Sequence, residues 1–191
     1  MDYMIKIDID DHLYLRILSQ RDTDALYQLT IESKEHLKQW LPWLDSIKTA
    51  EDSLQFIKNQ LLALEQRKGQ TYGIFAQNQL VGVISYNPLD FTNRIGTIGY
   101  WIGVHHAGNG YITKATKALC LYGFNHLELN RIEIKCATEN KLSQHIPERL
   151  GFKKEGVLRQ REWLYDHYVD HYLYALLNEE KERLSTEKTE N

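Results

Sequence analysis

The stretch RIGTIGYWIGVHHAGNGYITKA, residues 94–115, decides the fold. Residues 94–104 are rich in β-branched and aromatic side chains and contain three glycines, which predicts a strand that bulges or lies close to another backbone. Gly108 and Gly110 then predict a tight turn into a helix that begins near Gly110. The free N–H groups and the positive dipole end of that helix would form a cradle for an anion. Two glycines alone are more often a plain turn between two elements.

Neither common nucleotide-binding loop fits this turn. A Walker loop requires a following Gly-Lys-Ser/Thr, which is missing, and the dinucleotide fingerprint requires a third glycine, which is also missing. Both nucleotide interpretations are therefore weakened.

The segments after the turn predict a parallel crossover. Residues 110–126 have apolar side chains at helical spacing, and RIEIKCA, residues 131–137, alternates apolar with charged side chains as a strand does. A strand, a helix and a second strand in this order fit a connection between parallel neighbours. A short helix over residues 141–150 then ends at Gly151, and a last hairpin extends to about residue 177.

The N-terminal half supplies further strands and helices. Residues 13–18 predict a strand, and the helix that follows breaks near Pro42. Residues 51–66 predict a helix stopped by Gly69, and two apolar runs on either side of residues 77–79 predict a hairpin.

Length and composition favour one α/β domain. The chain has 191 residues, and no Gly-, Ser- or Pro-rich linker divides it. We expect one domain over residues 1–177, with a central mixed β-sheet and flanking helices. Residues 178–191 are expected to form a charged tail that frays.

Charge and hydropathy argue against two classes of partner. Lys and Arg number 23 against 26 Asp and Glu, a net charge of −3, so the usual electrostatic argument for nucleic-acid binding is absent. The longest apolar stretch, residues 118–124, is far shorter than the roughly 20 residues that cross a bilayer, and the acidic N-terminus does not resemble a secretory signal. Cys120 and Cys136 lie in apolar surroundings, which is typical of buried thiols in a reducing compartment. We therefore expect a cytoplasmic protein that binds neither nucleic acid nor membrane, and a homo-oligomer remains open.

Two blocks together resemble a known family. GYWIGVHHAGNGYITKA, residues 99–115, and LNRIEIKCATENKLSQHIPERLGFKKEGVLR, residues 129–159, are similar to the acetyl-CoA-binding half of the GNAT superfamily of N-acetyltransferases. With the LKQWLPW stretch, the likeness covers about residues 10–177. Within the superfamily, the chain most resembles the branch that acetylates the N-terminal serine or alanine of ribosomal proteins. The resemblance implies a splayed parallel strand pair, acetyl-CoA as cosubstrate, no metal, and a protein N-terminus as acceptor.

The resemblance also assigns a cofactor site. Ile102 and Val104 would offer backbone groups to the pantetheine arm, and Asn140 and Ser143 would face the thioester end. Five residues of the turn would hold the pyrophosphate: Gly108, Asn109, Gly110, Tyr111 and Ile112. Ser143 would in addition donate a proton to the leaving thiolate or orient a water toward it, although a plain helix serine is about as common.

The general base is missing from its usual position. Relatives often carry a glutamate just ahead of Gly-Tyr-Trp, where this chain has Thr97. The branch pattern points instead to Glu162, in RQREWLYD, as the group that takes a proton from the amine. A lone glutamate on a strand is usually a solvated surface charge, and only the resemblance singles this one out.

Three further positions depart from the family pattern. Ala107 and Ile112 stand where the phosphate turn usually opens with Gln or Arg and closes with Gly or Ala, which leaves the backbone N–H groups available. Pro147 falls inside the helix after Asn140, where its ring would clash with the carbonyl of Ser143 and kink the helix.

Histidines and aromatic residues have simpler interpretations. His167 and His171 could bind a metal together with Asp166 and Asp170 if the segment were helical, but we predict a strand and no metal site there. His105 and His106 precede the glycine turn without an assigned role. Four aromatic residues are expected to pack, with an exposed subset able to wall a peptide groove: Trp40, Trp43, Trp163 and Tyr165.

Acyl transfer to an amine requires that the amine be neutral. An α-amino group with a pKa near 8 is roughly a quarter neutral at pH 7.4, whereas a lysine is about 0.1% neutral, so a chain without the usual glutamate suits an α-amine better. Backbone N–H groups of residues 102–104 would meet the oxyanion. The alternatives are a small-molecule amine acetyltransferase, an inactive acyl-CoA-binding protein and, more remotely, a metal-dependent hydrolase.

Overall fold

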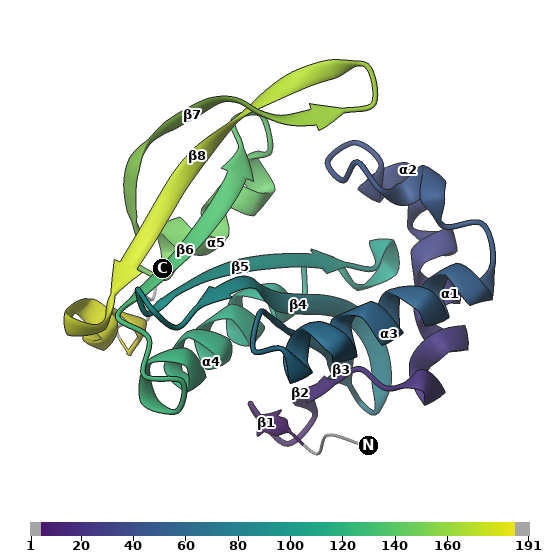
Figure 1. The fold of residues 1–191 in the computed structure, drawn as a ribbon, viewed down its shortest axis with the longest axis horizontal. Helices are drawn as coiled ribbons and strands as arrows, with labels where there is room; N and C mark the ends of the chain where they lie inside the picture. The colour runs from purple at the N-terminus through teal and green to yellow at the C-terminus, as the bar shows by residue number, and fades with distance from the viewer. Residues whose placement is uncertain (1–4, 186–191) are drawn as a thin grey trace.

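An eight-stranded sheet organises the chain, of which the computed structural model describes residues 5–185. Its spatial order is β1-β2-β3-β4-β5-β6-β8-β7, and β5 and β6 are the parallel neighbours in an otherwise antiparallel sheet (Figure 1). The strands are β1 (Lys6–Asp8), β2 (Leu13–Ile17), β3 (Gln70–Ala76), β4 (Gln79–Asp90), β5 (Ile95–Ile102), β6 (Arg131–Ala137), β7 (Lys153–Leu164) and β8 (His167–Leu177).

Helices cover both faces of this sheet. One face packs against α1 and α3, and the other packs against α4 and α5. No helix within residues 5–185 is long and apolar enough to span a membrane. The helices are α1 (Thr23–Glu32), α2 (Lys34–Leu37), α3 (Ala50–Glu65), α4 (Tyr111–Asn125) and α5 (Lys141–Arg149), with 3-10 turns η1 (Gln20–Asp22), η2 (Leu44–Ser46), η3 (Val104–His106) and η4 (Asn178–Leu184).

The predicted parallel crossover is confirmed. Strand β5 leads through α4 into β6, and the two strands pair in parallel from Ile95 opposite Arg131 to Ile98 opposite Ile134. The alternation predicted for residues 131–137 is also observed, because every second side chain of β6 is buried. The mixed α/β sheet expected from the sequence is therefore present.

Beyond Ile98 the two parallel strands separate. Residues 99–102 stay paired with β4, whereas residues 135–137 stay paired with β8. Each strand thus follows its antiparallel neighbour, and Figure 1 shows β5 and β6 diverging into a V. The edges that face each other across this splay have no strand partner there.

A buried tyrosine closes the opposite end of the pair. The Tyr86 ring on β4 is fully buried, and its hydroxyl donates to the carbonyl of Leu119 on α4 at 2.9 Å. A Cβ at Gly96 would lie 2.7 Å from the ring, and a Cβ at Gly123 would meet the hydroxyl. The approach of another backbone predicted for the glycine-bearing strand is not found at Gly96, where the space is filled by the Tyr86 side chain instead.

Two expectations are wrong, one about where α3 ends and one about the tail after residue 177. Gly69 does not terminate α3, because Arg67 takes the left-handed conformation (φ 56°) and Lys68 N–H donates to the Ala63 carbonyl at 2.8 Å. The tail expected to fray from residue 178 instead forms η4 and buries Leu184, which is 2% exposed. Residues 186–191 lie outside the described part, and the division into a domain over 1–177 and a tail stays a prediction.

We expect Gly123→Ala to destabilise the fold by about 1–3 kcal/mol, because the added methyl displaces the buried Tyr86 hydroxyl. Urea unfolding monitored by tryptophan fluorescence measures this loss. Gly156→Ala is the matched control, since nothing lies within 4 Å of a Cβ at that position. Equal stability of the two variants would contradict the role given to Tyr86.

Candidate functional site

Three polar side chains from three different elements meet inside the splay. They are Tyr100 on β5, Cys136 on β6 and Ser143 on α5. Ser143 Oγ lies 3.3 Å from Cys136 Sγ and 3.4 Å from Tyr100 Oη. Ser143 was expected here from the resemblance, but Tyr100 was not, because no local pattern distinguishes it from the neighbouring aromatic residues.

The first turn of α5 fixes Ser143. Asn140 is the N-cap, and its Oδ1 accepts from the Ser143 N–H at 3.1 Å. The helix continues through Pro147, which has no N–H to offer to the Ser143 carbonyl. That carbonyl accepts instead from the Tyr100 hydroxyl at 3.0 Å. The conflict predicted between Pro147 and Ser143 is thus resolved by a donor from another strand.

These groups are neutral near pH 7. Burial raises the pKa of the Tyr100 hydroxyl well above its ordinary value. Burial also raises the pKa of the Cys136 thiol, more than the bonds from Ser143 and Tyr100 lower it. The cluster therefore presents protonated donors, which can stabilise negative charge that develops beside them.

The glycine turn is an open backbone cradle. Gly108 (φ 83°) and Gly110 (φ 72°) are both left-handed, and a Cβ at either would have no atom within 4 Å. Helix α4 begins at Tyr111, so its first N–H groups have no helical acceptor. The Asn109 side chain donates to the His106 carbonyl at 3.0 Å, and Ile112 is buried in the core. Backbone groups, rather than these side chains, are available to an anion.

The backbone between β5 and the turn is already partly bonded. Ile102 pairs with Gly82 of β4, and Gly103 N–H donates to the Val81 carbonyl at 2.8 Å. The Val104 N–H donates to Ser33 Oγ at 3.0 Å. The prediction that N–H groups of residues 102–104 meet the oxyanion is therefore wrong for Gly103 and Val104, whose N–H groups are occupied within the fold.

Glu162 is not an isolated surface charge. Its Oε2 lies 3.4 Å from Nε2 of His171, and the two side chains are 33% and 12% exposed. The contact is an ion-pair distance without hydrogen-bond geometry, since Nε2 has no hydrogen-bond partner among the described residues. His171 pairs with Ala137, the last residue of β6, so this pair lies beside the open end of the splay.

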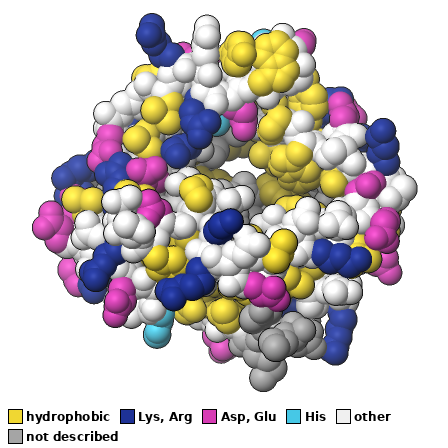
Figure 2. Space-filling model, in the orientation of Figure 1, with side chains coloured by type: hydrophobic (Ala, Val, Ile, Leu, Met, Phe, Trp, Pro, Cys, Tyr) yellow, Lys and Arg dark blue, Asp and Glu magenta, His cyan; other side chains and the backbone are white. Residues whose placement is uncertain are grey.

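The surface is hollowed beside the splay. In the orientation of Figure 1, Figure 2 shows a depression with hydrophobic side chains in the area bounded by β5, α2 and the β7–β8 hairpin. The Tyr165 hydroxyl of that hairpin donates to the Leu41 carbonyl at 2.6 Å, which ties the hairpin to the segment after α2. Trp163 is 52% exposed and lies edge-on to Tyr168, with ring centroids 4.8 Å apart. Of the four aromatic residues named from the sequence, Trp163 is exposed, and its exposed neighbour Tyr168 was not among them.

Trp43 and His167 each contact a neighbouring side chain of the fold. Trp43 packs near Trp101, with ring centroids 6.2 Å apart. His167 bonds Asp166 at 2.6 Å in the hairpin turn, and the strand predicted for its segment is confirmed. Within residues 5–185 no three His, Cys, Asp or Glu side chains gather as metal ligands.

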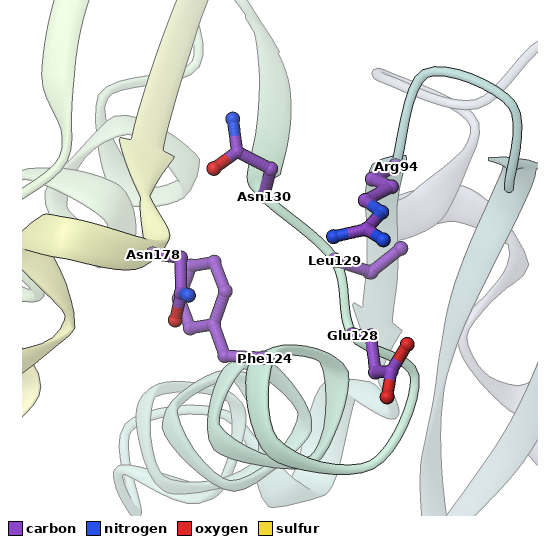
Figure 3. A pocket seen from close by; sticks show the side chains of 6 residues that line it. All are labelled: Arg94, Phe124, Glu128, Leu129, Asn130 and Asn178. Atoms are coloured by element: carbon purple, nitrogen blue, oxygen red, sulfur yellow. The ribbon is translucent and has the colours of Figure 1, made fainter.

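A second hollow, of about 370 Å³, lies away from the splay (Figure 3). It is found where β5 and β6 begin, whereas the predicted site residues gather where these strands end. None of the predicted cofactor or catalytic residues lines it. Its lining is Arg94, Phe124, Glu128, Leu129, Asn130 and Asn178.

The chain matches known proteins over most of its length. Residues 12–153 match the acetyltransferase (GNAT) domain family. A ribosomal-protein-serine acetyltransferase of Escherichia coli (strain K12) is 34% identical over 169 residues, which cover 88% of this chain and 94% of that protein.

Solved structures agree with this match. RimL, a ribosomal L7/L12 alpha-N-protein acetyltransferase in complex with coenzyme A, superposes with a TM-score of 0.88 at 29% identity, covering 91% of this chain and 98% of that one. The microcin C7 self-immunity acetyltransferase MccE, in complex with acetyl-CoA and AMP, gives a TM-score of 0.85 at 29% identity over 88% and 94% of the two chains. The resemblance drawn from residues 99–115 and 129–159 is thereby confirmed. This protein is an acetyl-CoA-dependent N-acetyltransferase, and the chain belongs to the GNAT family.

Proposed function

We propose that this enzyme transfers the acetyl group of acetyl-CoA to the N-terminal α-amine of a protein, by direct attack within a ternary complex. The observation that carries the proposal is the splay, which has an open phosphate cradle at one end and a cluster of neutral donors inside it. The acceptor class follows from the relatives, which include a ribosomal-protein-serine acetyltransferase and an L7/L12 alpha-N-protein acetyltransferase. An acceptor of this kind places the enzyme in the cytoplasm.

The cofactor would lie along the unpaired edge of β5. The pyrophosphate would bind the backbone of Gly108, Asn109, Gly110, Tyr111 and Ile112. The pantetheine arm would bond to backbone groups of β5 up to Ile102, as an added strand does, and to the carbonyl of Val104. Asn140 would hold the first turn of α5 so that Ser143 faces the thioester.

Cys136 supports this direction of binding. In the RimL complex, coenzyme A is joined to a cysteine of the protein by a disulfide, so a cysteine lies at the thiol end of the cofactor. Cys136 lies inside the splay against Ser143, whereas Cys120, on α4, is a fully buried residue of the core. Ser143 would then be placed to donate a hydrogen bond to the departing thiolate of coenzyme A, or to orient a water that protonates it.

Direct attack fits the state of the nucleophiles. An acetyl-enzyme intermediate would require a thiolate, but burial raises the pKa of the Cys136 thiol and only 2% of the residue is exposed. An α-amine with a pKa near 8 is already partly neutral at physiological pH and needs little help. Glu162, held beside His171, would accept the proton that the amine loses on attack.

A small-molecule amine is the second candidate acceptor. It is favoured by the match to MccE, whose structure holds acetyl-CoA and AMP rather than a peptide. Release of free coenzyme A should be measured with N-terminal serine and alanine peptides, polyamines and aminoacyl nucleotides. Turnover on peptides alone supports the proposal, turnover on small amines alone replaces it, and no turnover despite cofactor binding indicates an inactive acyl-CoA-binding protein.

Acetyl-CoA should stabilise the fold, because a ligand that binds only the folded state adds about 2.7 kcal/mol at a hundredfold excess over its dissociation constant. Thermal unfolding with acetyl-CoA, ATP and NAD measures this. A higher Tm with acetyl-CoA alone is expected, and an equal shift with ATP would indicate a different nucleotide ligand.

Gly110→Ala should raise the KM for acetyl-CoA about tenfold, because its methyl enters the space where phosphate oxygens approach the backbone. The left-handed backbone also predicts a loss of about 1 kcal/mol in stability. Gly151→Ala is the control for left-handed strain, since Gly151 (φ 79°) follows α5. Its added Cβ would also lie 3.0 Å from Arg183 Cβ, so its loss of stability should be at least as large. A KM that rises equally in both variants would move the phosphate site away from the turn.

Glu162→Gln should lower kcat by about 10²- to 10⁴-fold near pH 6.5 while acetyl-CoA affinity stays unchanged, as expected for a lost general base. The deficit should shrink toward pH 9, where an α-amine with a pKa near 8 is mostly neutral without assistance. Turnover of wild type, Glu162→Gln and the distant control Glu128→Gln is measured from pH 6.5 to 9. A deficit that stays constant with pH indicates positioning instead, and superimposed profiles indicate a surface charge.

A further inference from the structure

We propose that Tyr100 is a positioning residue that holds Ser143 across the splay through the carbonyl that Pro147 leaves free. The proposal rests on the proposed role of Ser143 and adds a residue that the family resemblance did not assign. It concerns how the reacting end of the cofactor is met, rather than a second activity.

No backbone pairing joins β5 to β6 beyond Ile98 and Ile134. Strand pairing between β5 and β6 ends at Ile98 and Ile134, and Tyr100 stands two residues beyond that end. Ser143 follows the other arm of the V, six residues after β6 ends. The hydrogen bond of 3.0 Å from Tyr100 Oη to the Ser143 carbonyl therefore joins the two arms where no ladder bond joins them.

The Ser143 carbonyl can accept this bond because position 147 of α5 is a proline. In an uninterrupted helix the N–H of residue 147 would donate to the carbonyl of residue 143. Pro147 has no N–H, so the Ser143 carbonyl would lack its helical donor inside a partly buried site. Tyr100 supplies the shorter of two side-chain donors to this carbonyl, at 3.0 Å, because Cys136 Sγ also donates to it at 3.5 Å from the same arm as Ser143. Tyr100 is therefore the donor that comes from the other arm, and burial raises the pKa of its hydroxyl, which keeps the proton in place.

Both peptide groups beside Ser143 are consequently held. Asn140 Oδ1 accepts from the Ser143 N–H, and Tyr100 donates to the Ser143 carbonyl. The hydroxyl of Ser143 is left with rotation about its own side chain, within reach of Cys136 Sγ and Tyr100 Oη. A group held in this way loses little further freedom when it reacts, which is the expected benefit of positioning.

The test is a set of variants measured on the best acceptor. Tyr100→Phe removes the donor and keeps the ring, so kcat should fall about fivefold, the value of one ordinary hydrogen bond, with an unchanged KM for acetyl-CoA. In a Ser143→Ala background the same change should have no further effect on kcat. Tyr27→Phe is the control, because Tyr27 Oη also donates to a backbone carbonyl, that of Lys48 at 3.0 Å, and this bond joins α1 to the residues just before α3.

A rescue variant tests the role of the carbonyl itself. Pro147→Ala restores the N–H that can bond to the Ser143 carbonyl, so Tyr100→Phe/Pro147→Ala should recover kcat relative to Tyr100→Phe. Recovery together with the missing effect in the Ser143→Ala background supports the proposal. An unchanged kcat in Tyr100→Phe, an equal loss in the Ser143→Ala background, or a double variant no better than Tyr100→Phe would overturn it.

A readout without turnover separates this inference from the proposed function. Loss of the Tyr100 bond should loosen α5 over Cys136, so a thiol reagent should label Cys136 at least about threefold faster in Tyr100→Phe, with Cys120 as internal reference. If labelling is faster but the wild-type protein acetylates no amine, the inference about Tyr100 stands and the proposed function is rejected. Unchanged labelling in an active enzyme would reject the tie.

Discussion

The site depends on one constraint, which is that β5 and β6 are each paired more extensively to an antiparallel neighbour than to each other. Four parallel pairs join them, from Ile95 to Ile98 on β5, and after that point each strand follows its own partner. Sheet twist makes neighbouring strands rotate, so strands anchored on opposite sides diverge once their own pairing stops. The divergence exposes the edge of β5 and leaves room beside it for α5.

The closed end of the pair keeps this opening local. The buried Tyr86 ring fills the space left by Gly96 and Gly123, and its hydroxyl bonds to α4, so β4, β5 and α4 form one tightly packed unit. Burial raises the pKa of the Tyr86 hydroxyl well above its ordinary value, which keeps it a donor. Any widening must therefore take place at the far end, where Tyr100 bonds to the carbonyl and to the hydroxyl of Ser143.

Features set by neighbours in sequence were predictable, and features set by distant contacts were not. The alternation of residues 131–137 and the left-handed glycines of the turn are local, and both are found as expected. The Val104 N–H, in contrast, is occupied by Ser33, 71 residues away, which no spacing rule indicates. The end of α3 was missed for a different reason, because an arginine at position 67 takes the left-handed position that glycine normally favours.

The candidate catalytic groups show the same division. Glu162 and Ser143 could be proposed from a resemblance, but their surroundings could not. A strand glutamate gives no sign in sequence that a bulge in β7 and a histidine on β8 will place an imidazole 3.4 Å from its carboxylate. Pro147 did give a sign, since a proline four residues after Ser143 implies a free carbonyl, yet its donor, Tyr100, precedes Ser143 by 43 residues.

The two arms of the V have different chemical characters, and this bears on the order of events. The arm of β4, β5 and α4 carries the unpaired strand edge and the glycine turn proposed to bind the cofactor, whereas the arm of β6, α5, β7 and β8 carries Ser143 and Glu162. The donors around Cys136 are uncharged and partly buried, which would suit a thiolate that develops charge only as it leaves. Glu162 is partly exposed beside the open end, so a proton that it accepted from an amine could return to solvent. If the proposed sites hold, cofactor and acceptor would enter from different sides of one opening, and a cofactor that fills the splay first would complete the surface against which the amine binds.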